Sequence, residues 1–194
     1  MTTFELGTKV PLLVRAPFVA GAVAGLRRHE LAEAVDLFPT MVSLAGLPPV
    51  PSCEALAGTD LSQLLVAGDP AAAVENKSYA FSQFAKKYVW SKETQQREAW
   101  NTCGGVNRSA IDLFGYSVRA ASGWRYTEWR AWNGTAQRAE WGPPPVAREL
   151  YAQPDSCGGD FDCQSPAAND WNTSTAHRAI ADELAAVVRA QFKS

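Results

Sequence analysis

The stretch AEAVDLFPTMVSLAGLPPVP (residues 32–51) shows how the N-terminal part of the chain is built. Pro39 lacks an N–H group and is tolerated only in the first turn of a helix, which places the helix start near Asp36 or Leu37. Gly46 suits the left-handed residue that closes a helix, and the prolines after it prevent continuation. The stretch predicts one amphipathic helix packed on a core, with Asp36 as its cap. Its apolar face consists of Leu37, Met41, Leu44 and Ala45.

The segments around this helix indicate a sheet of the α/β class. KVPLLVR (9–15) is apolar on both faces, which is typical of a buried strand in a parallel or mixed sheet. Residues 17–30 are expected to form a loop and residues 31–35 a short strand. In GTDLSQLL (58–65), Asp60 is the predicted cap of a short helical turn. One or two strands cannot satisfy their own backbone groups, so this part is expected to be the end of a larger domain.

The pattern changes after a linker-like tract at 67–77. SYAFSQFA (78–85) alternates and predicts a strand, whereas the polar residues 86–110 predict a long loop. FGYSVRAASGWRYTEWRAW (114–132) predicts a hairpin that turns at Gly123. RELYAQ (148–153) is expected to add a short strand.

The C-terminal residues STAHRAIADELAAVVRAQFKS (174–194) predict an amphipathic helix that Ser174 or Thr175 caps. Ala185 is expected to lie toward solvent. The buried stripe is expected to be Ile180, Leu184, Val188 and Phe192, packed on a hairpin face formed by Tyr116, Val118, Trp124 and Tyr126. A small antiparallel sheet with one packed helix makes a complete two-layer unit. The predicted fold is therefore the end of a mixed α/β sheet domain at 1–66, followed by this subdomain at 78–194.

Composition excludes some classes of function. The chain has 194 residues, of which 46% are apolar and 20% are charged, with a net charge of −2. No basic excess points to nucleic acid, and no apolar run is long enough to span a membrane. This length suits one domain, or one domain and a piece of another.

Cysteines and glycosylation acceptors point to the secretory route. DSCGGDFDCQS predicts either a disulfide between Cys157 and Cys163 in an oxidising compartment or two reduced thiols. Zinc and calcium are disfavoured there, because the spacing fits neither a zinc knuckle nor a calcium loop. N-x-S/T acceptors lie at Asn76, Asn107, Asn133 and Asn172. We therefore expect a lysosomal or extracellular protein.

Several motifs resemble, in order, the C-terminal part of the sulfatase family of the alkaline-phosphatase-like superfamily. They are FELGTKVPLLVRAP, AEAVDLFPTMVSLAGLPPVP, GTDLSQLL, AFSQFAK, FGYSVRAASGWRYTEWRAW and ARELYAQ, across residues 4–153. The sequences of these motifs are most similar to those of the iduronate-2-sulfatase type. The segment 155–173 departs from the family, being longer and carrying two cysteines. The resemblance implies hydrolysis of a sulfate ester on a sulfated glycan.

The resemblance also implies a catalytic centre that this sequence does not contain. Sulfatases use a formylglycine made in a C/S-x-P-S-R motif together with a divalent cation, and neither that motif nor the DHG segment is present here. No catalytic or metal-binding residue is assigned to the chain, which alone is expected to be inactive. Calcium and formylglycine are expected in a missing N-terminal sulfatase domain, which is the expected partner.

Two sets of residues remain as candidates for contact with sugar. The predicted loop offers Lys86, Lys87, Trp100 and Arg108 for substrate binding. Trp124, Trp129, Trp132 and Trp141, with Arg125 and Arg130, either stack on sugar rings or fill the core of the small subdomain. The alternative function is a non-catalytic carbohydrate-binding or structural remnant of a sulfatase.

Overall fold

The computed structural model describes residues 3–48, 57–66, 77–90, 97–101, 110–152 and 169–193. These residues form two compact units. One combines Met1–Val10 with Phe81–Ser194, and the other is Pro11–Ala80. The predicted linker lies almost entirely outside the described residues, so its limits stay a prediction.

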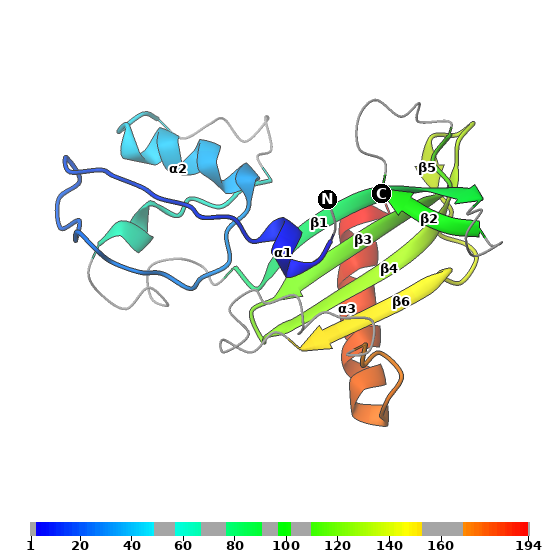
Figure 1. Ribbon diagram of the computed structural model, residues 1–194. Helices are drawn as coiled ribbons and strands as arrows, with labels where there is room; N and C mark the ends of the chain where they lie inside the picture. The colour runs from blue at the N-terminus through cyan, green and yellow to red at the C-terminus, as the bar shows by residue number, and fades with distance from the viewer. Residues whose placement is uncertain are drawn as a thin grey trace. The chain divides into compact units, whose positions relative to one another are not determined.

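An antiparallel sheet forms the centre of the larger unit (Figure 1). It has six strands in the order β2-β1-β3-β4-β5, and β6 also pairs with β4. The strands are β1 (Tyr79–Trp90), β2 (Arg97–Asn101), β3 (Leu113–Ala120), β4 (Trp124–Asn133), β5 (Arg138–Ala139) and β6 (Ala147–Ala152). The small antiparallel sheet predicted from the sequence is confirmed, as are its strands at 78–85 and 148–153.

The predicted hairpin is β3 and β4. Gly123 adopts a φ of 93°, which favours glycine, and its N–H donates to the carbonyl of Ala120 at 3.1 Å. Val118 lies opposite Tyr126 in the register, and Tyr116 lies opposite Glu128. Opposed residues share a face of the sheet, so Tyr116, Val118 and Tyr126 lie together as predicted, and Glu128 lies on the same face.

The prediction of one long loop at 86–110 is wrong. β1 continues to Trp90, and β2 pairs with it so that Lys87 lies opposite Trp100. The polar composition misled the prediction, because an antiparallel ribbon needs no apolar face on both sides to satisfy its backbone.

The terminal helix α3 (Thr175–Phe192) covers one face of this sheet, behind it in Figure 1. Ser174 caps the helix by accepting the N–H of His177 at 3.1 Å. Leu184 and Val188 are buried, and the Phe192 ring lies 4.9 Å from that of Tyr116. The predicted stripe is confirmed, but Ala185 is only 1% exposed, so its expected position toward solvent was wrong.

A short helix, α1 (Glu5–Thr8), lies on the other face of the sheet, in front of it in Figure 1. The Phe4 ring meets that of Tyr151 edge-on at 5.6 Å. Arg125 donates to the Glu5 carboxylate at 2.6 Å. The N-terminal residues therefore pack with the C-terminal sheet, which no sequence pattern indicated.

The smaller unit is built around α2 (Leu37–Leu44), which follows the 3₁₀ turn η1 (Ala34–Asp36). The helix ends as predicted at Gly46, whose φ is 64° and whose N–H donates to the carbonyl of Ser43. The predicted short helical turn is η2 (Ser62–Leu65), and Asp60 Oδ1 accepts the N–H of Ser62 at 2.8 Å.

Two predicted strands are absent from the described residues. Residues 9–15 continue α1 as irregular chain, and Leu13 is 93% exposed. Residues 31–33 are irregular too, and Ala34 begins the turn η1. A strand forms only when a neighbour satisfies its backbone groups, and the described chain supplies none at either place.

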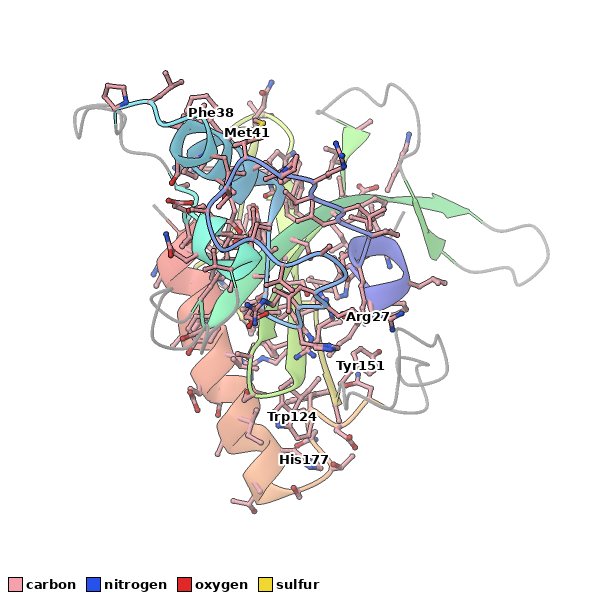
Figure 2. All side chains as sticks on the ribbon, turned by 90° about the vertical axis from the view of Figure 1, so that its left-hand side faces the viewer. Arg27, Phe38, Met41, Trp124, Tyr151 and His177 are labelled. Atoms are coloured by element: carbon pink, nitrogen blue, oxygen red, sulfur yellow. The ribbon has the colours of Figure 1, made fainter. Side chains whose placement is uncertain are left out.

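The expected packing of α2 on a core is also wrong for this chain. Phe38 and Met41 project from α2 (Figure 2), and both are exposed, as is Leu37. Asp36 does not cap α2 with its side chain. Its buried carboxylate instead accepts the N–H groups of Glu33 and Thr59 and pairs with Lys77 at 2.6 Å. No helix in the described part of the chain is long and apolar enough to cross a membrane.

Candidate functional site

A row of residues crosses the sheet on the face away from α3. Lys86 comes from β1, Gly115 from β3, Trp129 from β4 and Glu149 from β6. Gly115 and Trp129 are direct partners in the register, and Thr127 lies opposite Glu149. Because side chains alternate along a strand, Trp129 and Glu149 lie opposite the face of Tyr126 and Glu128 that α3 covers. We call these four residues the Lys86 row.

Gly115 makes room for the indole ring at the centre of the Lys86 row. A Cβ atom at Gly115 would lie 2.6 Å from Cζ3 and 2.8 Å from Cη2 of Trp129. Real Cβ atoms do not approach ring atoms so closely, so only glycine lets the ring lie flat over β3. The ring is 5% exposed and reaches across β3 toward Lys86 on β1.

Lys86 places its ammonium group over this ring. Nζ lies 4.0 Å from the centroid of the Trp129 ring, a cation–π contact. Burial lowers the pKa of Lys86, and the charge of Glu149 opposes that shift. No carboxylate in the described part of the chain lies within ion-pair distance of the ammonium.

Glu149 is the last residue of the row and lies on β6, next to Trp129. Its Oε1 accepts the indole N–H of Trp129 at 2.8 Å. Its Oε2 is buried and has no hydrogen-bond partner among the described residues. Burial raises the pKa of Glu149, while the Trp129 hydrogen bond and the charge of Lys86 oppose the shift. The row thus combines a half-buried cation, an indole and a carboxyl group whose pKa is raised by burial.

The neighbouring part of the same face is closed by α1. Arg125 donates to Glu5 at 2.6 Å and to the Thr8 hydroxyl at 3.1 Å. Burial lowers the pKa of Arg125, and the hydrogen bond to Glu5 opposes this shift. Every charge here has a partner, so this cluster holds α1 on the sheet.

The face under α3 holds a second buried network. Glu128 accepts from Arg130 at 2.8 Å and from the Tyr126 hydroxyl at 3.1 Å. Arg189 of α3 lies 3.6 Å from the same carboxylate. This network ties β4 to the helix and leaves no charge of the three residues unpaired.

The four tryptophans contact other side chains on the sheet, and three of them are half-buried. Trp132 stacks on Phe114 at 4.9 Å, and Trp141 lies 5.0 Å from the Tyr116 ring. Trp124 contacts the ring of His177 at 5.3 Å (Figure 2). Together with the buried Trp129, these contacts favour the core interpretation of the four residues.

The structure brings one of the four predicted substrate-binding residues into the row. Lys86 belongs to it, whereas Lys87 follows on the strand and is exposed. Trp100 is described only through the pairing of its backbone with Lys87, and Arg108 lies outside the described residues. Their roles in binding stay predictions.

The predicted modifications are also untested. Asn133 is half-buried, and its side-chain oxygen accepts the N–H groups of Thr135 and Ala136. Asn172 is exposed beside the start of α3. The remaining sites, which lie outside the described residues, are Asn76, Asn107, Cys157 and Cys163.

Sequence reasoning missed Glu149 and the role of Gly115. Part of this information was present in the sequence. Side chains alternate along β4 and β6, and this alternation puts Trp129 and Glu149 on one face. Strand pairing across β3, however, was needed to bring Lys86 to them.

Candidate metal ligands do not cluster in the described part of the chain. No group of three or more His, Cys, Asp or Glu side chains there could hold a metal ion. No catalytic step through a metal is assigned to these residues, and the calcium expected in an N-terminal domain stays a prediction.

No family model matches the chain. A stretch of 65 residues is 45% identical to arylsulfatase A of Homo sapiens, and it covers 34% of this chain and 12% of that protein. Arylsulfatase A of Bos taurus matches at 45% identity over 67 residues, with the same two shares. The chain therefore matches only a small part of the length of these relatives. The similarity supports a relation to the sulfatases.

Proposed function

We propose that this chain is the C-terminal portion of a sulfuric ester hydrolase that acts on sulfated carbohydrate. The observation that carries the proposal is the 45% identity to arylsulfatase A over 65 residues. The ordered motifs of the sequence support it, because they resemble the end of the same family. The small antiparallel sheet with one packed helix is the fold that this resemblance predicts for the C-terminal subdomain.

The surface of the smaller unit supports a partner domain. Among the described residues, eleven of the fourteen exposed large apolar side chains lie within Pro11–Ala80. The buried residues described in this unit are few and largely polar, namely Asp36, Thr40, Leu61, Ser62 and Leu64. Such an apolar surface marks a site of protein interaction.

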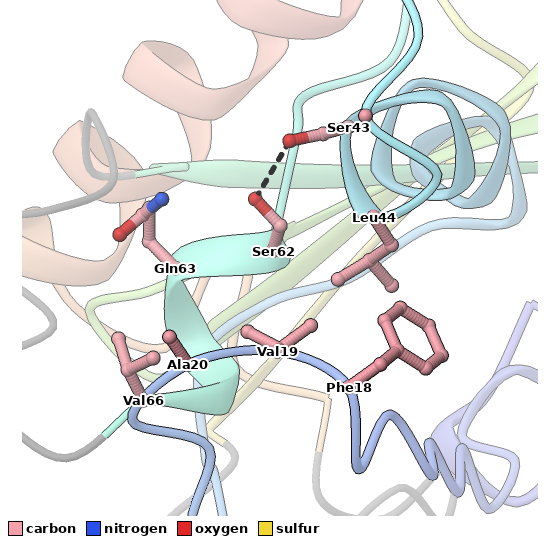
Figure 3. Close-up of a pocket in the computed structure, with 9 residues that line it drawn as sticks. Phe18, Val19, Ala20, Ser43, Leu44, Ser62, Gln63 and Val66 are labelled. Atoms are coloured by element: carbon pink, nitrogen blue, oxygen red, sulfur yellow. Dashed lines mark hydrogen bonds between the residues drawn. The ribbon is translucent and has the colours of Figure 1, made fainter.

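The unit also has an open pocket of about 300 Å³ (Figure 3). Phe18, Val19 and Leu44 line it with apolar atoms, and the hydroxyls of Ser43 and Ser62 lie 3.1 Å apart at its wall. The pocket suits the apolar side chains of a covering domain.

The proposed partner is the N-terminal α/β domain of the sulfatase. Residues 10–14 are extended, and side chains on both of their faces are exposed. A segment of this kind is buried on both sides when it is an inner strand of an α/β sheet. Formylglycine and calcium belong to that domain in this proposal, and they supply the nucleophile and the charge stabilisation when present.

The type of sulfatase is a finer part of the proposal. The C-terminal motifs are similar to the iduronate-2-sulfatase type, whereas the matched relatives are arylsulfatases A. The secretory route is proposed from the four glycosylation acceptors and the even number of cysteines.

The proposal is tested by assaying the purified 194-residue chain on an aryl sulfate, with and without calcium. We expect no turnover, because the motif that yields formylglycine is absent from this sequence. Turnover that persists after all four cysteines are replaced would show a nucleophile within this chain and would overturn the proposal.

A further inference from the structure

The ammonium group of Lys86 pairs with no anion in the described part of the chain. It is half-buried, it lies 4.0 Å from the Trp129 ring centroid, and no described carboxylate pairs with it. An ammonium group has three N–H donors, and an aromatic face does not satisfy all of them. The position therefore has the charge and the donors to receive an oxyanion.

Glu149 offers a second group beside Trp129, the residue that Lys86 also contacts. Its Oε2 lacks a partner among the described residues in either protonation state. An ionised Oε2 would need a donor, whereas a protonated one would need an acceptor. Burial raises the pKa of Glu149, and below that raised pKa the carboxyl group carries a proton and offers an O–H donor within the Lys86 row.

We infer that Lys86 and Glu149 form a subsite for an oxyanion carried by a sugar, a sulfate or a carboxylate group. The oxyanion accepts hydrogen bonds from Lys86 Nζ and from the protonated Oε2 of Glu149. Trp129 fixes Glu149 through Oε1 and supports Lys86 through its ring. The inference rests on the proposed function for the nature of the ligand.

The charges around the subsite agree with this assignment. Lys86 on β1 and the indole N–H of Trp129 on β4 face Glu149, and the charge of Glu149 also acts on the phenol of Tyr151 on β6. Ionised Glu149 would repel an oxyanion. Binding is therefore expected to weaken as the pH rises from mildly acidic to neutral.

The test is a titration of the 194-residue chain with sodium sulfate at constant ionic strength and mildly acidic pH. The indole N–H signal of Trp129 in heteronuclear NMR reports binding, because that proton bonds to Glu149. We expect a saturable shift of this signal with sulfate and none with an equal charge of chloride. Galactose 6-sulfate and glucuronate then show which oxyanion the subsite prefers.

Two variants and one control variant identify the residues. Lys86→Gln should weaken sulfate binding at least about tenfold, whereas the exposed Lys87→Gln should leave it unchanged. Glu149→Gln should keep binding and lose its pH dependence, because the amide N–H₂ donates at every pH. Absence of a saturable shift, or equal binding by Lys86→Gln and the wild type, would overturn the inference.

The outcome of the oxyanion titration can be distinguished from the outcome of a test of the proposed function. Sulfate binding in a chain whose transcript encodes no sulfatase motifs upstream would keep the subsite and reject the proposed function. A transcript with those motifs, together with a chain that binds no oxyanion, would keep the proposed function and reject the subsite.

Discussion

At the scale of single residues, Gly115 determines how Trp129 packs. Replacing it with alanine should force the indole ring or β3 to move, because the new Cβ would lie 2.6 Å from the ring. Overpacking of this kind costs about 1–3 kcal/mol. Urea unfolding followed by circular dichroism should show a lower free energy of unfolding for Gly115→Ala.

Gly142 provides the matched control for this substitution. Nothing lies within 4 Å of a Cβ built there, so Gly142→Ala should leave stability unchanged or raise it by ~0.4–1 kcal/mol. Equal stability of the two variants would show that the ring does not lie against Gly115.

Glu149 gives the larger unit a pH-dependent stability. Burial raises its folded pKa above the ordinary value of 4.5, so the folded state holds this proton more tightly than the unfolded state. The contribution of the group is therefore most favourable at low pH and is lost as the pH rises through the folded pKa. Comparison of the wild type with Glu149→Gln separates the contribution of Glu149 from those of the other carboxylates.

The measurement for Glu149 is urea unfolding at several pH values between mildly acidic and neutral. The stability of the wild type relative to Glu149→Gln should fall as the pH rises across this range. A relative stability that rises with pH would mean that the carboxylate is better stabilised when ionised than the structure indicates.

Residue types predicted some local details and missed others. Gly46, Gly123, Asp60 and Ser174 act where their conformational or capping preferences placed them. Asp36 shows the limit, because its carboxylate binds Lys77, which lies 41 positions away in the sequence. Local patterns contain no information on such a distant partner.

At the scale of elements, α3 seals the sheet through Leu184. Leu184→Ala removes a buried side chain and leaves a cavity, which costs ~2–5 kcal/mol. A domain of ordinary stability has only ~5–15 kcal/mol, so a chemical or thermal melt should shift strongly or disappear.

Ala186→Ser is the control for this helix, because Ala186 is exposed whereas its neighbour Ala185 is buried. A surface change of this kind should alter stability by less than ~0.5 kcal/mol. Equal effects of the two substitutions would contradict the packing of α3 on β3 and β4.

Periodicity predicted the elements that carry a clear local pattern of apolar residues. The hairpin and α3 carry clear patterns, and both formed as expected. The pairing of β2 with β1 and the packing of α1 were missed, because they depend on contacts between distant or polar segments. The Lys86 row needed three strand pairings at once, so the sequence suggested Lys86 without its neighbours.

At the scale of the whole molecule, segments of the chain differ in how far their backbone N–H groups are hydrogen-bonded. The N–H groups of residues 10 and 12–15 make no backbone hydrogen bond in the described part of the chain. Hydrogen exchange should therefore be fast in these residues and slow in β3, β4 and the middle of α3. Slow exchange from residues 10 to 14 in a monomer would contradict the surface described here.

The central claim is that the chain is the end of a sulfatase, and sequencing of the transcript upstream of the Met1 codon tests it most directly. The account predicts an in-frame coding sequence with a C/S-x-P-S-R motif and a DHG segment. A stop codon in frame close to the Met1 codon, with neither motif upstream, would contradict it.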